Sequence, residues 1–137
     1  MFIKTSLNLD IQGQYLDILR DFLDSEYTAL QYGEIYEVYQ IEKAIHGILK
    51  SMQEKREELR DLLMGVSVKE YASELPAHLS GMVIRKLDRV TALEADCMAK
   101  TSRNASLSMI LAGRELEKPV MGASAFHVNP AAEGRVQ

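Results

Sequence analysis

The chain is poor in cysteine and proline, and it has no long apolar run. Its one cysteine, Cys97, cannot form a disulfide within the chain or assemble a cysteine-based zinc site. Its three prolines, Pro76, Pro119 and Pro130, all lie in the second half, which leaves the first half free to form long helices. No stretch approaches the ~18 consecutive apolar residues of a membrane span, and no signal-peptide pattern opens the sequence. These absences favour a cytoplasmic protein without membrane insertion.

An excess of positive charge is also absent. Sixteen Lys and Arg against twenty Asp and Glu give a formal net charge of −4, which argues against nucleic-acid binding. The 137 residues, 47% hydrophobic and 26% charged, predict one folded domain. The first 64 residues carry seven basic and twelve acidic side chains, and the remainder carry nine and eight. The acidic first half is therefore expected to pair with the second half.

Hydrophobic periodicity predicts two helices in the first half. Residues 15–30 place their apolar side chains on one broad stripe, and Asp10 or a near neighbour is expected to cap this helix. Gly33 predicts a break, because glycine costs about 1 kcal/mol in a helix interior relative to alanine. After the break, apolar positions alternate by three and four, which is typical of a coiled-coil seam. This seam consists of Val38, Ile41, Ile45, Ile48, Met52, Lys55, Leu59 and Leu62.

Local signals organise the second half. Gly65 is a C-terminal stop, and the sequence from Ser67 to Glu70 matches a capping box that starts a short helix through Ser73. Pro76 suits the first turn of a last helix, which extends to about residue 117. Its seam consists of Leu79, Val83, Lys86, Val90, Leu93, Cys97, Lys100, Asn104, Leu107, Leu111 and Arg114. The predicted fold is all-α, an elongated antiparallel bundle of three to four helices over residues 1–118 with a flexible C-terminal tail over 119–137.

No constellation of residues predicts catalysis. His46, His78 and His127 are far apart, and none shows the i, i+4 spacing of a helical metal site. Cys97 occupies an apolar seam position, where a thiol acts as a small hydrophobic residue. The carboxylates of residues 53–58 lie at the spacing of helical charge pairs, and no glycine-rich phosphate loop is present. We therefore expect no enzyme, no metal and no cofactor.

Two features are candidates for interaction surfaces. Tyr32, Tyr36 and Tyr39 stand at helical spacing and form either an exposed aromatic ridge or, as the acidic surroundings favour, packing around the break at Gly33. The end of the last helix is apolar on more faces than one seam requires. That face either binds an amphipathic segment in a groove or supports self-association. The apolar residues there are Leu107, Met109, Ile110, Leu111 and Leu116.

The order of these features resembles a known family. A first helix ends in ALQYGEI, a second contains YQIEKAIHGILKSMQEKREEL, a last helix contains TSRNASLSMIL, and a tail follows with VMGASAF. This arrangement resembles the FlgN family of flagellar export chaperones over nearly the whole chain. Each motif is weak by itself, so the resemblance depends on their order and spacing. The positions that carry it are Leu30, Gly33, Glu42, Lys43, Leu49, Asn104, Leu107, Gly122 and Ala123.

The resemblance implies a small cytoplasmic chaperone without catalysis or cofactor. Such a protein binds the helical termini of hook-associated proteins at the hook-filament junction, prevents their premature assembly and delivers them to the flagellar type III export gate. The implied substrate-binding face is the latter half of the last helix, with Asn104 as a further marker, although Asn104 is at least as well explained as a polar seam residue that fixes register. The implied face consists of Asn104, Leu107, Ile110, Leu111 and Leu116.

The tail departs from the family pattern at one position. Where the family has a tyrosine before Gly-Ala, expected to contact the export gate, this chain has Met121. Met121 supplies apolar contact without the hydroxyl, and Phe126 is a nearby aromatic that can replace the ring. The alternative belongs to a different class of protein. It is a structural coiled coil that self-associates, as a homodimer for example, through the same face of the last helix and has no role in export.

Overall fold

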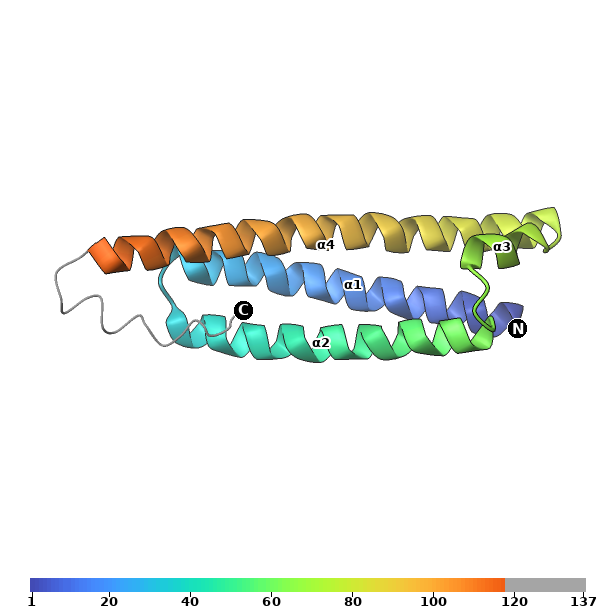
Figure 1. The fold of residues 1–137 in the computed structure, drawn as a ribbon, viewed down its shortest axis with the longest axis horizontal. Helices are drawn as coiled ribbons and strands as arrows, with labels where there is room; N and C mark the ends of the chain where they lie inside the picture. Colours follow the sequence, from blue (N-terminus) through green and yellow to red (C-terminus); the bar gives the residue numbers. More distant parts are fainter. Residues whose placement is uncertain (118–137) are drawn as a thin grey trace.

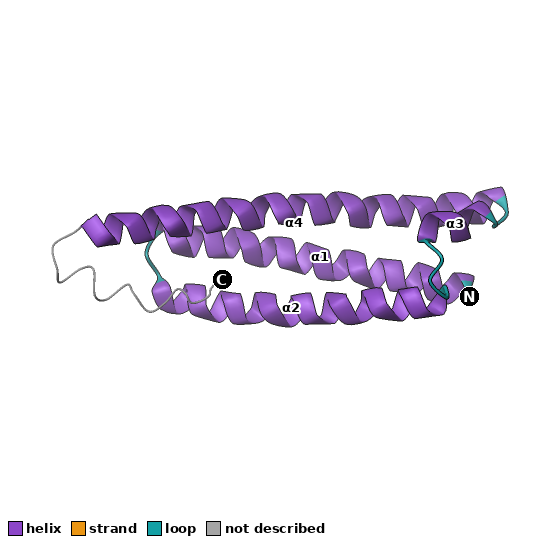
Figure 2. Cartoon of the chain, viewed as in Figure 1, coloured by secondary structure: helices purple, strands orange, loops and turns teal. Residues whose placement is uncertain are grey.

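Residues 1–117 fold as an elongated bundle of four helices. The computed structural model describes the backbone of residues 1–117 and the side chains of residues 1–114. Within that part no strand occurs, which confirms the all-α prediction. Helix α4 has 41 residues and is therefore about 60 Å long. The helices are α1 (Phe2–Gln31), α2 (Ile35–Leu62), α3 (Val68–Ser73) and α4 (Ala77–Glu117) (Figures 1 and 2).

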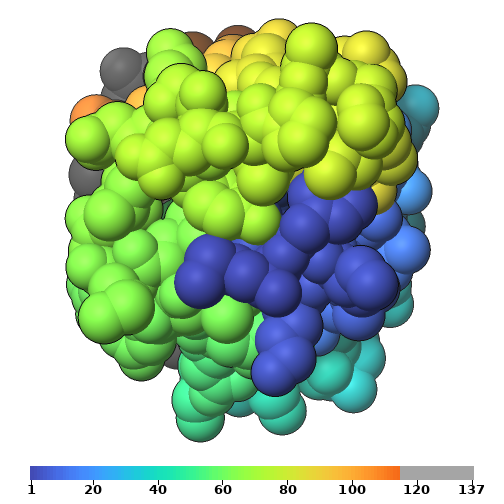
Figure 3. All heavy atoms as spheres, turned by 90° about the vertical axis from the view of Figure 1, so that its right-hand side faces the viewer, coloured from blue at the N-terminus to red at the C-terminus, as the bar shows by residue number. Residues whose placement is uncertain are grey.

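Helix α1 is the central element of the bundle. Consecutive long helices run antiparallel, so α1 and α4 run parallel to each other (Figure 1). Helix α1 packs against both α2 and α4, whereas no Cα atom of α2 comes within 8 Å of one in α4. The short helix α3 packs on α4 at the end where α1 begins, and Figure 3 views the bundle from this end. The bundle is thus an open arrangement of α2 and α4 on either side of α1.

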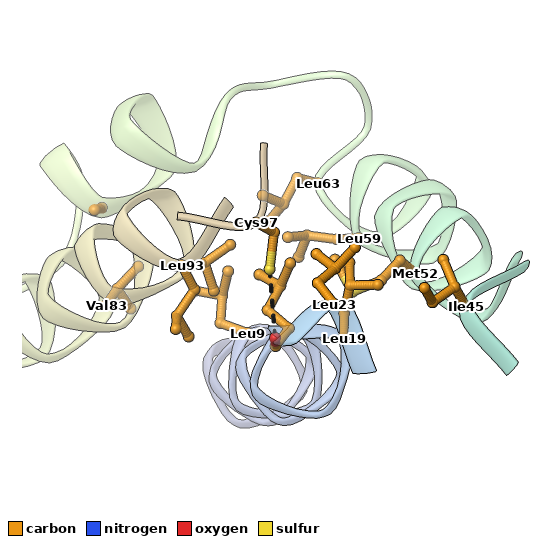
Figure 4. Packing of buried hydrophobic residues seen from close by; sticks show 13 residues of the cluster. Leu9, Leu19, Leu23, Ile45, Met52, Leu59, Leu63, Val83, Leu93 and Cys97 are labelled. Carbon is orange, nitrogen blue, oxygen red and sulfur yellow. Dashed lines mark hydrogen bonds between the residues drawn. The ribbon is translucent and has the colours of Figure 1, made fainter. Parts of the chain in front are cut away.

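The core lies where the predicted seams meet. The apolar stripe of residues 15–30 is buried or half-buried against the other helices, except that Ile18 is 43% exposed. In Figure 4, Ile45 and Met52 of α2 point toward Leu19 and Leu23 of α1. At the end of α2 the buried residue is Leu63, next to the predicted seam residue Leu62, and Ala29 and Leu30 of α1 are buried as well. The other members of the core cluster are Leu9, Leu16, Leu59, Ala72, Val83, Val90, Leu93 and Cys97.

The local signals between the helices are confirmed. Gly33 adopts φ +67° and Gly65 φ +83°, a left-handed conformation that glycine tolerates best. Helix α3 begins after Ser67, whose Oγ accepts a hydrogen bond from the Glu70 backbone N–H at 3.1 Å. The Ser67 hydroxyl in turn donates to the Glu70 carboxylate at 3.2 Å. Capping and glycine chemistry therefore set these boundaries locally.

The start of α1 was predicted wrongly. Helix α1 begins at Phe2, eight residues before the expected cap at Asp10. Asp10 instead lies within the helix and accepts a hydrogen bond from Lys86 Nζ of α4 at 2.6 Å. The first two turns bury Thr5 and Leu9 in the bundle, so tertiary packing, and not a capping side chain, extends the helix.

Charge pairs join α1 to α4 along their length. Lys86 bonds Asp10, Arg89 bonds Asp17, and Lys100 Nζ lies 2.7 Å from Asp24 Oδ1. The expected pairing of the acidic first half with the second half is thus present. Each pair is partly exposed and contributes ~0–1 kcal/mol, but together they fit one parallel register of the two helices.

Three glycines test how backbone conformation sets helix stability. A Cβ at Gly47, in the interior of α2, would meet nothing within 4 Å, so Gly47→Ala should raise the free energy of unfolding by roughly 0.5–1 kcal/mol. Gly33→Ala should lower it by about 1 kcal/mol, because an L-residue at positive φ is strained. At Gly13 the new Cβ would displace the Arg89 guanidinium, so we expect a gain smaller than that at Gly47. Thermal and urea unfolding measure all three, and equal effects at Gly33 and Gly47 would contradict this explanation.

Candidate partner-binding surface and the polar junction

Asn104, which the family resemblance places on the substrate-binding face of the last helix, lies inside the bundle. It is 3% exposed, and its Nδ2 donates to the Leu23 carbonyl oxygen at 2.8 Å and to Glu26 Oε1 at 2.7 Å. These bonds tie α4 to the last turns of α1. In this conformation Asn104 does not present its amide to a partner, and its contacts match those of a polar residue that fixes helix register.

A buried carboxyl group, Glu26, is the bonding partner of Asn104. Its side chain is 8% exposed and faces the carboxyl group of Glu42 on α2. Burial in the bundle, followed by the hydrogen bond with Glu42, raises the pKa of Glu26 from 4.5 to about 7, although the Asn104 bond opposes this shift. Near neutral pH a substantial fraction of Glu26 is therefore protonated in the folded state.

Arg103 completes the polar contacts on the α4 side. Its Nε donates to Asn104 Oδ1 at 3.0 Å, and its Nη2 donates to the Leu23 carbonyl oxygen at 3.2 Å and to Asp24 Oδ1 at 3.3 Å. The guanidinium carbon lies 4.1 Å from the centre of the Tyr27 ring, a cation–π contact. A hydrogen bond from Lys100, with a weaker one from Arg103, lowers the pKa of Asp24.

We call this group of contacts the polar junction. It comprises Asp24, Glu26, Glu42, Arg103 and Asn104. Sequence reasoning missed the contribution of Glu26 and Glu42. A signal was present, because Glu26 stands three residues after Leu23 and four before Leu30, a seam position at which a charged residue is unexpected.

The other predicted binding residues divide between two sides of α4. Leu107 and Leu111 are half-buried, whereas Met109 is 75% and Ile110 52% exposed. The structure describes no side chain for Leu116, and Met121 and Phe126 lie outside the described residues. The apolar surface available at this end of α4 is therefore centred on Ile110 and Met109.

The prediction that the three tyrosines pack around the break at Gly33 is wrong. Tyr32, Tyr36 and Tyr39 are all between 58% and 76% exposed. Ile41 and Ile45 face the core in their place, so the ring faces of the tyrosines are left outside the seam. The Lys43 ammonium lies 5.8 Å from the centre of the Tyr39 ring. The aromatic ridge is thus a surface feature at the start of α2.

Residues 1–117 hold neither a cluster of metal-binding side chains nor a membrane-spanning helix. No group of three His, Cys, Asp or Glu side chains is placed to hold a metal ion in this part of the chain. None of its helices combines the length and hydrophobicity needed to cross a bilayer. Comparison with protein-family models, curated proteins and solved structures gave no match.

Glu26 makes stability depend on pH. The folded state binds its proton more tightly than the unfolded state, so stability should fall as pH rises from about 4.5 to 7. Glu26→Gln keeps an oxygen for Asn104 and has no proton to lose. Its stability advantage over the wild type should be roughly 2 kcal/mol larger at pH 8 than at pH 5. Urea unfolding at both pH values measures this, with Glu54→Gln, an exposed residue of α2, as the control. An identical pH profile for Glu26→Gln and the wild type would refute the assignment.

Cys97 is expected to be inert in the folded protein. Its thiol is buried and donates to the Leu16 carbonyl oxygen over 3.6 Å (Figure 4), which confirms the predicted core role. Burial raises the pKa of Cys97, so little thiolate forms at neutral pH. A bulky thiol reagent should react with the native protein far more slowly than with the urea-unfolded chain. Equal rates would show an accessible thiolate and contradict the core role of Cys97.

Proposed function

We propose that the chain is a flagellar type III export chaperone that binds helical termini of hook-associated proteins. It keeps them from premature assembly and delivers them to the export gate. The order of sequence motifs, which resembles that of the FlgN family, supports this proposal. The all-α bundle, whose three long helices contain those motifs, supports it as well. The observation that carries it is that the bundle is incomplete, because α2 and α4 pack on α1 but not on each other.

An incomplete bundle suits the capture of an additional helix. Four-helix bundles bury the apolar stripes of all their members around one core. Here the apolar side chains of Met109 and Ile110 on α4 remain exposed, as do those of Ile35 and Leu49 on α2. An amphipathic helix of a partner can cover such residues by laying its apolar face along them. Junction-protein termini, as amphipathic segments, need such cover before they assemble.

The alternative is a structural coiled coil that self-associates through the same face of α4, where Met109 and Ile110 are exposed. Because both functions use this face, the partner that is bound separates them. A chaperone binds junction-protein segments, whereas the structural coiled coil forms an oligomer and binds none of them.

Binding to a junction-protein segment tests the proposal. The probe is the C-terminal segment of a hook-associated protein from the same organism, titrated calorimetrically into the full chain. We expect binding with a negative heat-capacity change, which is the mark of apolar burial. Ile110→Asp should weaken it at least about tenfold. The matched control is Ile18→Asp, which changes an isoleucine of similar exposure on α1 and should leave affinity unchanged.

Two results would overturn the proposal in different ways. Equal affinities for Ile110→Asp and the wild type would remove the assigned face on α4. The absence of binding by the wild-type chain to the C-terminal segments of all hook-associated proteins would remove the chaperone function. If sedimentation then showed a stable oligomer that Ile110→Asp dissociates and Ile18→Asp does not, the structural coiled coil would be the better account.

A further inference from the structure

A groove separates α2 from α4, and its deepest part is a hollow of about 360 Å³. Leu9 and Gln12 of α1 form the floor of the hollow, and Val66 in the linker between α2 and α3 lies at its end. We call this the closed end of the groove. The walls of the hollow include Arg56, Leu59, Arg60 and Leu63 of α2 and Leu87 and Glu94 of α4.

The α2 wall continues beyond the hollow with exposed apolar side chains. Seven residues make nearly two helical turns, so positions seven apart lie on the same side of a helix. Counting back from Arg56, the groove side of α2 carries Leu49, Glu42 and Ile35. Leu49 is 48% and Ile35 53% exposed. Within the described residues α2 packs on α1 alone, so this side of α2 has no neighbouring helix.

The facing side of α4 carries no charge beyond Glu94 in the described side chains. Residues three or four positions apart follow one side of a helix. On the side of Glu94 they are Met98, Thr101, Ala105, Ser108 and Ala112. Side chains this small allow a neighbouring helix to approach closely, and none of them is a charge that a bound helix would strip of water.

The charges of the groove are separated along its length. At the closed end Arg56 bonds Glu94 across the groove, and Arg60 lies one turn farther toward the end of α2. Arg60 is exposed and forms no ion pair with the side chains of residues 1–114. Toward the start of α2 the exposed charge on the groove side is Glu42. The groove therefore offers a free cation at its closed end and an anion at its other end.

A helix that ends in a free carboxylate has the complementary polarity. Its N-terminus carries about half a positive charge from the helix dipole, and its C-terminus carries the corresponding negative charge. With its C-terminus at Arg60 and its N-terminal part near Glu42, such a helix matches both ends of the groove. It then runs parallel to α2 and antiparallel to α4. The distance from Ile35 to Arg60 along α2 is ~38 Å, which corresponds to a helix of about 25 residues.

We propose that the groove between α2 and α4 binds the C-terminal end of an amphipathic partner helix that runs parallel to α2. The terminal carboxylate accepts hydrogen bonds from the Arg60 guanidinium, whose planar donor geometry suits a carboxylate. The last apolar side chain of the partner enters the hollow beside Leu59 and Leu87. This inference rests on the proposed chaperone function and adds to it a direction for the bound segment and a requirement for a free C-terminus.

Amidation of the bound segment tests the role of the carboxylate. The C-terminal segment of the hook-associated protein is titrated into the full chain in two forms, one with a free carboxylate and one with a carboxamide. The carboxamide should bind at least about tenfold more weakly to the wild type, because it has no charge to pair with Arg60. Equal affinities of the two forms would overturn the inference and leave the chaperone function intact.

Substitution of Arg60 tests the other side of the same contact. Arg60→Gln should weaken binding of the free acid by a similar factor and should leave binding of the carboxamide unchanged, since both changes remove one interaction. The matched control is Arg85→Gln. Arg85 is an exposed arginine nine residues before Glu94 and therefore on the opposite side of α4. An equal loss in Arg85→Gln would reveal general electrostatic attraction and contradict a specific site at Arg60.

A nitroxide spin label on one end of the segment tests the direction. A label at the C-terminus should broaden the amide NMR signals of residues 56–63, and a label at the N-terminus should broaden those of 35–42. The reverse pattern would overturn the parallel arrangement while still showing that the segment binds. Failure of both forms of the segment to bind would remove the chaperone function together with this inference.

Sedimentation of the chain without partner tests the remaining occupant, a second copy of the chain. The proposal expects that Leu49→Asp leaves the sedimentation of the chain unchanged and weakens binding of the segment by tenfold or more. A wild-type dimer that Leu49→Asp dissociates would show that a second copy fills the groove. Leu7→Asp, which changes a leucine of similar exposure on α1, is the control for both measurements.

Discussion

The parallel pairing of α1 with α4 is the constraint on which the rest of the bundle depends. Every long helix contacts α1, but only the α1–α4 interface is joined by charge pairs from one end to the other. Individually these pairs add little stability in water, yet a shift of register by one turn would separate them together. Asn104 ends this series with bonds to the Leu23 carbonyl oxygen and Glu26, which are buried and costly to leave unpaired.

Because α4 takes one side of α1, α2 takes the other, and no Cα atom of α2 comes within 8 Å of one in α4. The two flanking helices are bridged by Arg56 and Glu94, and α3 covers the end where α1 begins. At the opposite end the bonds of Asn104 tie α4 to α1, and exposed apolar side chains there include Tyr36 and Ile110. Exposed apolar residues also lie where α1 begins, Ile3, Leu7 and Met64 among them, so the proposed binding surface is distinguished by its place on α4 and not by exposure alone.

Much of the fold follows from the sequence because its determinants are local or periodic. The seams of α2 and α4, the break at Gly33 and the cap at Ser67 depend on spacing or on the conformation of one residue. The start of α1 and the exposure of Tyr36 depend on which faces of the helices meet, and periodicity leaves that open. The polar junction was missed for the same reason, because Glu26 and Glu42 meet only after α1 and α2 are placed side by side.

Leucine at position 26 would continue the stripe formed by Leu19, Leu23 and Leu30, and apolar replacements of buried charges are often neutral or stabilising. The carboxyl group therefore does not serve maximal stability near neutral pH. It gives Asn104 a partner and so fixes the register of α4, a role that either protonation state fulfils. Burial, with the Glu42 carboxyl nearby on α2, raises the pKa of this glutamate, so the folded state loses stability as pH rises and the acid ionises. A glutamate at this seam position thus links α1 to α4 through Asn104 at a cost in stability that grows with pH.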